Sequence, residues 1–312
     1  MSTLLRVQAG ARRYPLVLIA SGVLLYSSGP VMLQASALSG PLFSFWRLWM
    51  GVAVLGAATL VQHRMGVAWP TREQWRWAAL SGVAFGTHQL FFFSAIRITT
   101  VVDVALMNAL APVVTAIGAY WMFDERPDRS FWSWAAVAIA GAALLAVAAS
   151  SAPSGSAIGM AMAVTNVVFF AIFFLVSKKG RDHIAVVPFL FGTMLVAALL
   201  VTGFVTAIGA QPGVATTRDL VLAGAVAAGP GAIGHLVMTW PLRYVPANIP
   251  PVMRLAQPVG SGLLAWWFLG EGLSWRHLFA GLLVIAGAAG TVLGRGGRAL
   301  RADAAREDLP ET

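Results

Sequence analysis

The strongest constraint on the fold of this chain is a succession of long apolar stretches that covers almost its whole length. Residues 15–35, 41–62 and 134–149 are examples, close to the roughly 20 residues that a helix needs to cross a bilayer. Hydrophobic residues make up 58% of the sequence and charged residues 11%, against about 45–50% and about 25% in soluble domains. One globular core cannot hide that much apolar surface, so the sequence predicts an integral membrane protein.

Helices are favoured over a β-barrel because the apolar stretches are continuous rather than alternating, and backbone groups in lipid must be paired internally. Polar breaks divide the chain into ten expected spans. They are residues 15–35, 41–62, 75–96, 98–123, 131–150, 156–177, 185–209, 219–242, 245–270 and 275–294. The absence of cysteine excludes disulfides and thiolate metal ligands.

Basic residues are distributed unevenly over the connections between these spans. Of the 21 Lys and Arg residues, Arg97, Arg218 and Arg276 fall on one side of the membrane, and Arg47 and Arg254 fall within spans. All the others lie on the side that holds both termini. The positive-inside rule therefore predicts cytoplasmic N- and C-termini in a multi-pass protein of the inner (plasma) membrane. This placement accounts for the net charge of +9 without a nucleic-acid partner, because anionic lipid attracts basic loops.

The N-terminal region also has features of a secretory signal peptide. Arg12 and Arg13 precede an apolar run, and residues 35–37 (Ala-Ser-Ala) resemble a cleavage site. However, the run is longer than the roughly 7–15 residues of a signal peptide, and its removal would leave nine spans. We therefore expect the first span to be retained. Residues 297–312 are expected to form a disordered cytoplasmic tail.

An internal repeat with a period of 146 residues divides the chain into two halves. LAPVVTAIGAYWMFDE at 110–125 matches AQPVGSGLLAWWFLGE at 256–271, and IAGAA at 139–143 recurs at 285–289. Each copy of about 150 residues holds five spans, so the second copy enters the membrane from the opposite side. The predicted fold is an all-α integral membrane protein with ten transmembrane helices in two inverted five-helix repeats, 1–150 and 151–296. The same offset pairs Arg97 with Arg243, Met107 with Met253, Asn108 with Arg254, Pro112 with Pro258, and Glu125 with Glu271.

The duplicated segments resemble the EamA domain of the drug/metabolite transporter superfamily, once in each half. The resemblance is carried by AIRITTVVDVALMNALAPVVTAIGAYWMFDERPDRSFW at 95–132 and PLRYVPANIPPVMRLAQPVGSGLLAWWFLGEGLSWRH at 241–277. It implies a ten-helix exporter or permease of small metabolites. The length and aromatic content are most similar to those of the YddG-type aromatic amino-acid exporters.

Polar residues inside the spans are the candidates for a substrate cavity, because a charge at the bilayer centre costs at least about 2.5–3.5 kcal/mol on insertion scales. The candidate cavity residues are His88, Met107, Asn108, Asn166, Phe170, Arg254 and Gln257. His88 is interpreted as a substrate-facing donor or proton site, or as a histidine tied to a neighbouring helix. Arg254 either binds a substrate carboxylate or gates the path, or reaches the membrane edge. His235 corresponds to His88 at a spacing of 147.

Other residues are expected to shape or support the cavity. Pro112 and Pro258 are the expected hinges, since proline removes a helix hydrogen bond. Arg47 is expected to make a structural contact between helices. Glu125 and Glu271 fall on opposite membrane faces, and we expect them to tie loops to helix ends rather than to form a catalytic pair.

The expected function is a secondary transporter that exports small metabolites, amino acids including aromatic ones, by alternating access. Efflux of cationic drugs is an alternative, but it favours an acidic residue in the cavity, and we place only Asp103, at the outer edge, inside a span. The sequence leaves two energy sources open, facilitated diffusion and proton coupling through a histidine. A scaffold or receptor is a third possibility, although neither requires an inverted duplication.

An enzyme is not expected, since no HExxH, GxSxG or paired-carboxylate pattern occurs. The sequence at 229–234 matches a dinucleotide fingerprint, but it lies inside an apolar span without a preceding strand. No catalytic residue, metal site or cofactor is predicted. The expected partners are a small-molecule substrate and the lipid bilayer, and the protein is expected to be a monomer.

Overall fold

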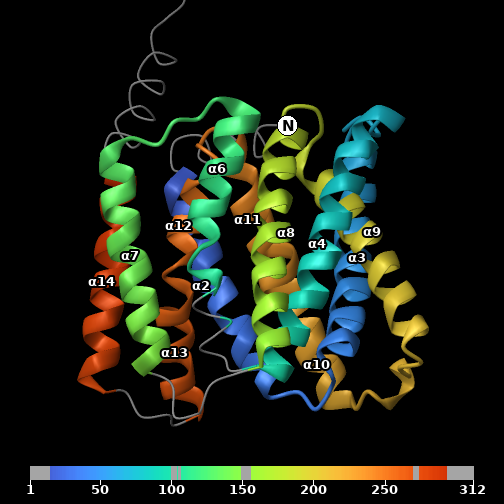
Figure 1. The fold of residues 1–312 in the computed structure, drawn as a ribbon. Helices are drawn as coiled ribbons and strands as arrows, with labels where there is room; N and C mark the ends of the chain where they lie inside the picture. Colours follow the sequence, from blue (N-terminus) through green and yellow to red (C-terminus); the bar gives the residue numbers. More distant parts are fainter. Residues whose placement is uncertain (1–14, 100–103, 105–106, 149–155, 270–273, 294–312) are drawn as a thin grey trace, which may run out of the picture.

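The computed structural model describes residues 15–99, 104, 107–148, 156–269 and 274–293 of the chain. Its regular elements are helices, which stand side by side in a bundle (Figure 1). Six are long and apolar enough to cross a membrane. They are α2 (Pro15–Gln34), α3 (Gly40–Arg64), α4 (Arg72–Ile98), α8 (Ala157–Arg181), α9 (Val186–Ala207) and the composite helix Thr217–Arg243.

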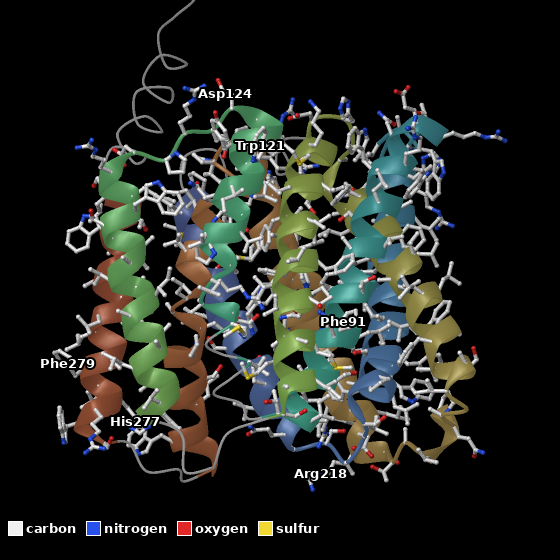
Figure 2. All side chains as sticks on the ribbon, in the orientation of Figure 1. Phe91, Trp121, Asp124, Arg218, His277 and Phe279 are labelled. Atoms are coloured by element: carbon white, nitrogen blue, oxygen red, sulfur yellow. The ribbon has the colours of Figure 1, made fainter. Side chains whose placement is uncertain are left out.

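Four further crossings complete the two halves. They are α6 (Ala111–Phe123), α7 (Arg129–Ala148), α12 (Ile249–Arg254) followed by α13 (Gln257–Leu269), and α14 (Trp275–Leu293). Corresponding crossings run in opposite directions: α7 follows Asp124 at one end of the bundle, whereas α14 begins beside His277 at the opposite end (Figure 2). The predicted fold of ten transmembrane helices in two inverted repeats is confirmed.

Two crossings are broken, within the spans expected at 98–123 and 245–270 and close to the two prolines expected to act as hinges. In the first half, turn residues 109 and 110 separate helical residue Asn108 from α6; in the second, turn residues 255 and 256 separate α12 from α13. Pro112 and Pro258 follow two residues after these turns. Proline has no N–H to donate to the carbonyl four residues earlier. The carbonyls deprived of that helical bond belong to Asn108 and Arg254.

The two breaks have the same backbone hydrogen bonds at the repeat offset. The N–H of Leu110 donates to the carbonyl of Met107 at 3.0 Å, and the N–H of Ala256 donates to the carbonyl of Met253 at 3.1 Å. Leu110 and Ala256 in turn accept bonds of 3.0 and 3.1 Å from the residues three positions later. The duplicated sequence therefore encodes the same interruption twice.

The composite helix Thr217–Arg243 is irregular at its centre. It consists of α10 (Thr217–Val226), the π-helical segment η2 (Ala227–Gly234), α11 (His235–Thr239) and the 3₁₀ segment η3 (Trp240–Arg243). Pro230 lies inside η2. A proline inside a helix loses a backbone bond, and π-helical turns often mark such positions and functional sites. This segment contributes to the cavity described below.

The repeated IAGAA motif explains the contact between α7 and α14. A Cβ atom on Gly141 would lie 2.6 Å from the backbone N of Val284, and one on Gly287 would overlap the backbone N of Ala138. Ala138 and Val284 are themselves related by the 146-residue offset, so the contact is reciprocal. A glycine at each copy is needed because the two backbones approach too closely for any side chain.

Glycines also allow α4 to pack closely on α9. A Cβ atom on Gly82 would lie 2.7 Å from the carbonyl oxygen of Thr193, and one on Gly86 would lie 3.0 Å from the Cα atom of Ala197. α4 packs on α8 over its other side. The large buried side chains Phe85 and Phe173, each 1% exposed, lie at this contact between the first and second halves. α4 and α8 thereby form one wall of the central cavity.

Candidate functional site: a cavity between the inverted halves

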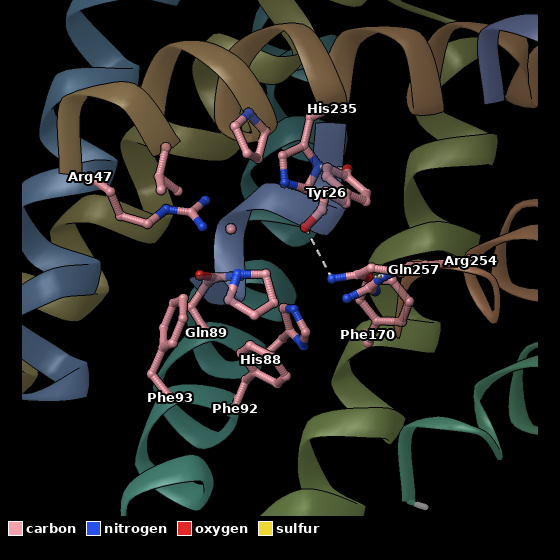
Figure 3. A pocket seen from close by; sticks show the side chains of 14 residues that line it. Tyr26, Arg47, His88, Gln89, Phe92, Phe93, Phe170, His235, Arg254 and Gln257 are labelled. Carbon is pink, nitrogen blue, oxygen red and sulfur yellow. Dashed lines mark hydrogen bonds between the residues drawn. The ribbon is translucent and has the colours of Figure 1, made fainter. Parts of the chain in front are cut away.

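A cavity lies between the two halves, close to the breaks and to the π-helical segment (Figure 3). Its walls come from α2, α3 and α4 of the first half, and from α8, the composite helix, α12 and α13 of the second. The lining residues are Tyr26, Gly29, Pro30, Arg47, His88, Gln89, Phe92, Phe93, Phe170, Val226, Pro230, His235, Arg254 and Gln257. Side chains from six crossings therefore converge on one point.

Aromatic rings form much of the cavity wall. The ring of His88 lies 4.8 Å from that of Phe170 and 5.9 Å from that of Phe92, centroid to centroid. Behind them, Phe85 contacts both His88 and His235, at 5.9 and 4.8 Å. The two histidines that correspond in the repeats thus meet across one phenylalanine.

His235 is also held by a hydrogen bond from the first half of the chain. Its Nδ1 lies 2.7 Å from the hydroxyl oxygen of Tyr26, and both residues are buried. Because Tyr26 is on α2 and His235 is on α11, this bond joins the two halves inside the cavity wall.

Arg254 extends from the end of α12 into the cavity and is held there. Its Nε donates to the side-chain oxygen of Gln257 at 2.9 Å, and its guanidinium carbon lies 3.9 Å from the ring centroid of Phe170. Gln257 in turn donates to the backbone oxygen of Tyr26 at 3.2 Å. Arg254 and Gln257 lie on either side of the break at residues 255 and 256, as the last residue of α12 and the first of α13.

Three polar side chains in the cavity wall are buried without satisfying all their hydrogen-bonding atoms. Arg47, His88 and Gln89 are 6%, 3% and 4% exposed. Arg47 Nε and Nη2, His88 Nδ1 and Gln89 Oε1 have no hydrogen-bond partner among the residues that the structure describes. An unsatisfied buried polar group costs about 1–3 kcal/mol. These atoms are therefore available to a ligand.

The charged residues of the cavity are of one sign. Its 14 lining residues, all in the described part of the chain, include Arg47 and Arg254 and no Asp or Glu. In the low dielectric of a membrane interior two guanidinium groups favour an anionic group strongly and disfavour a cation. The cavity thus suits a molecule with an acidic group and an apolar or aromatic remainder.

The structure brings together four of the candidate cavity residues: His88, Phe170, Arg254 and Gln257. Asn166 and Asn108 instead pair with each other, with the Asn166 amide donating to Asn108 Oδ1 at 2.8 Å, one helical turn from Phe170. Met107 packs against the hydrophobic core. These three residues are near the cavity but do not line it.

Tyr26 and Gln89 line the cavity although neither was among the predicted residues, and Arg47 lines it although a structural contact was expected there. Arg47 does contact a neighbouring helix, since its guanidinium carbon lies 5.8 Å from the ring centroid of Phe85 on α4. The guanidinium group also lines the cavity (Figure 3). The histidine pair at a spacing of 147 was the one signal for His235. Tyr26 lies in an evenly apolar stretch that gives no sign of which face is buried. Asp103 and Glu271 lie outside the described residues.

The prediction that Asp103 is the one acidic residue inside a span is wrong, because Asp219 is buried at the start of the composite helix. It is 2% exposed at the start of α10 and closes a capping box with Thr216. Its carboxylate also accepts hydrogen bonds from the Ser36 hydroxyl at 2.7 Å and from the backbone N–H of Ala37 at 2.9 Å. Asp219 therefore connects α10 to the loop between α2 and α3, away from the cavity.

A second polar cluster lies at the opposite end of the bundle, beyond α6. Glu125 Oε1 pairs with Lys178 Nζ at 3.1 Å, and Oε2 accepts the backbone N–H of Ala247 at 2.8 Å. Lys178 also donates to the backbone oxygens of Leu242 and Val245 at 3.2 and 2.6 Å. We call this group the Glu125–Lys178 cluster. It links the ends of α6 and α8 to the segment that follows η3.

Comparison with known proteins agrees with this architecture. A crystal structure 19% identical in sequence superposes with a TM-score of 0.76, over 92% of this chain and 99% of the other. The uncharacterized transporter YwfM of Bacillus subtilis (strain 168) is 27% identical over 290 residues, which are 88% of this chain and 94% of that protein.

The family comparison matches each half of the chain separately. The sequence model of the EamA-like transporter family matches residues 13–147 and again residues 157–293. These two matches cover most of the chain and coincide with the two inverted halves of the bundle. The protein is thus a multi-pass membrane transporter and belongs to the EamA-like transporter family.

Proposed function

We propose that this transporter exports small amphipathic metabolites, among them amino acids with aromatic or other apolar side chains, by alternating access. The observation that carries the proposal is the cavity between the inverted halves, with its aromatic walls and its unpaired polar atoms at Arg47, His88 and Gln89. A carboxylate suits the guanidinium groups. The buried amide oxygen of Gln89 suits a donor such as an ammonium group, and Phe92, Phe93 and Phe170 suit an apolar side chain.

The two inverted halves suggest how the cavity changes sides. In transporters with this symmetry, one half rocks against the other around a central site. We infer that the breaks before Pro112 and Pro258 act as hinges, because each lacks a helical hydrogen bond and each adjoins a polar residue of the central region. Exchange of the outward-facing and inward-facing forms then needs no covalent step.

We further propose that the end of the bundle with the Glu125–Lys178 cluster faces the cytoplasm. The basic residues at the ends of α3 and α8 and at the start of α4 belong to this end, and the positive-inside rule favours it. Export of a cationic drug is less well supported, since the lining residues, all among those described, include two arginines and no carboxylate.

Counterflow in proteoliposomes tests this proposal. Purified protein is reconstituted into vesicles loaded with unlabelled L-phenylalanine, and uptake of labelled L-phenylalanine, L-leucine or L-glutamate is followed at equal internal and external pH. We expect loaded vesicles to accumulate the apolar amino acids several-fold over protein-free vesicles. Labelled tetraphenylphosphonium serves as the cationic probe. Counterflow of the cation without counterflow of any amino acid would contradict the proposal.

A further inference from the structure

The two arginines of the cavity differ in what already surrounds them. Arg254 has a side-chain acceptor in Gln257 and lies over the Phe170 ring. Arg47 is 6% exposed, yet its Nε and Nη2 have no hydrogen-bond partner among the described residues. In Figure 3 the two guanidinium groups extend into the cavity from opposite walls. Arg47 therefore presents two adjacent, fully buried donors without a partner, whereas Nε of Arg254 is already paired with Gln257.

Arg47 also cannot reach water along its own helix. It lies seven residues after Gly40, about 10 Å along α3 at 1.5 Å per residue. A charged group at that depth is costly unless a partner or a cavity receives it. The side chain faces the cavity, next to Gln89, His88 and His235.

The repeat shows that the fold does not require an arginine at this position. At the repeat offset of 146, Arg47 of the first half corresponds to Thr193 of the second. Thr193 is 1% exposed, and its hydroxyl donates to the backbone oxygen of Ala78 at 3.4 Å. In the second half the position is thus filled by a small residue bonded to the neighbouring helix. The guanidinium group is an addition in the first half alone, so a purely architectural role does not explain it.

We propose that Arg47 is the anion-binding residue of the cavity and holds the carboxylate of the transported molecule, while Arg254 supports the aromatic wall. Adjacent guanidinium nitrogens match the two oxygens of a carboxylate in a bidentate pair. This assignment rests on the proposed transport function and adds a substrate class, organic molecules that carry a carboxylate. It also differs from the sequence-based expectation, which left carboxylate binding by Arg254 as one of several alternatives and gave Arg47 a structural contact.

Binding measurements on the full-length protein in detergent test the assignment without relying on transport. The probes are 3-phenylpropionate and 3-phenylpropanamide, which share the aromatic ring and differ in the charged carboxylate. We expect the wild type to prefer the carboxylate, and Arg47→Gln to weaken binding of the carboxylate about tenfold to a hundredfold, with little change for the amide. Arg47→Lys keeps the charge but not the bidentate geometry, so it should restore part of the preference.

Two further variants serve as controls. Arg76→Gln removes the same charge from an exposed position near the start of α4 and should leave both affinities unchanged. Arg254→Gln should weaken both probes to a similar extent, because it disturbs the wall that receives the ring. Thermal unfolding of each variant checks that the protein is folded.

Three results would overturn the assignment: no preference for the carboxylate in the wild type, equal losses for both probes in Arg47→Gln, or loss of the preference in Arg254→Gln alone. The test separates this inference from the proposed function. If amino-acid counterflow is absent but the carboxylate preference depends on Arg47, the proposed substrates are wrong and the anion-binding role of Arg47 stands.

Discussion

The central cavity lies between apolar helices and the Glu125–Lys178 cluster lies half-buried at the end of the bundle; the two polar regions differ in how far their polar atoms are paired. In the cluster, both oxygens of Glu125 have partners and Lys178 contacts three oxygens. In the cavity, atoms of Arg47, His88 and Gln89 have no partner within the described part of the chain. A satisfied polar group stabilises a structure, whereas an unsatisfied one retains binding capacity for a ligand.

The largest expected difference between the two regions is in transport. His88→Ala removes a ring from the wall beside Phe170 and an unpaired donor or acceptor, and should reduce counterflow at least about tenfold, as for a loss of about 1.4 kcal/mol. Glu125→Ala should reduce it less than about threefold, because Glu125 lies outside the cavity. Initial counterflow rates in proteoliposomes measure both. Equal effects would show that the cavity is not the transport site.

For stability the ranking of the two regions should be reversed. Glu125→Ala leaves the backbone N–H of Ala247 and the ammonium group of Lys178 without their carboxylate partner, and should lower the free energy of unfolding by about 1–3 kcal/mol. His88→Leu replaces an incompletely paired polar side chain by an apolar one and should change it by less than about 1 kcal/mol. Denaturant titrations in detergent measure both values. A more destabilising His88→Leu would place His88 among the structural residues.

The two broken crossings are intermediate between the cavity and the Glu125–Lys178 cluster. Their backbone lacks a helical hydrogen bond, but the polar side chains beside the breaks are partly paired. Pro258→Ala and Pro112→Ala each supply a backbone N–H that can donate to the carbonyl of Arg254 or Asn108. We expect each variant to slow exchange between the outward-facing and inward-facing forms about threefold to tenfold, because a continuous helix favours one of the two forms. Affinity for the substrate should change less than the rate. A Pro→Ala variant with normal turnover in either half would mean that its break is static.

The smallest effect is expected at Gln74, which lies at the same end as the Glu125–Lys178 cluster but near the surface. Its side chain completes a capping box with Thr71 and donates to the backbone oxygen of His183 at 2.6 Å. Gln74→Ala should lower the unfolding free energy by about 1 kcal/mol, as for the loss of a helix cap, and change counterflow less than twofold. A tenfold loss of counterflow would indicate that this contact takes part in opening the cavity.

Much of the architecture follows from one-dimensional patterns. Apolar stretches of helix length predict membrane crossings, and the 146-residue repeat with an odd number of crossings predicts two inverted halves. The match of the EamA-like family model to each half and the helical bundle confirm this fold, and family membership confirms a transporter rather than an enzyme. The paired prolines predict a hinge in each half, but they do not predict that the helix is interrupted at residues 109 and 255, since proline near the start of a helix is also common in unbroken helices.

The cavity was predicted only in part. His88 and Arg254 were found because polar residues are rare in apolar spans, but Tyr26 belongs to a helix that is nearly uniform in hydrophobicity and so gives no preferred face. Gln89 is a polar residue in the same apolar span as His88, so the same signal applied to it, although it was not among the predicted residues. Arg47 was recognised as a charge inside a span, while its orientation toward the cavity depends on how α3 packs against α4 and α10.

The sequence by itself determined the membrane environment, the two inverted halves and the paired prolines, because these depend on the composition and order of residues along one chain. Only the tertiary structure decided which polar side chains share a cavity and which are already paired. Six crossings from both halves meet there, and close packing fixes how they are rotated, as at Gly82 and Gly86, where α4 packs on α9. The contrast between the two arginines arises from that packing: Nε of Arg254 has an acceptor in Gln257, and Nε and Nη2 of Arg47 are buried without one.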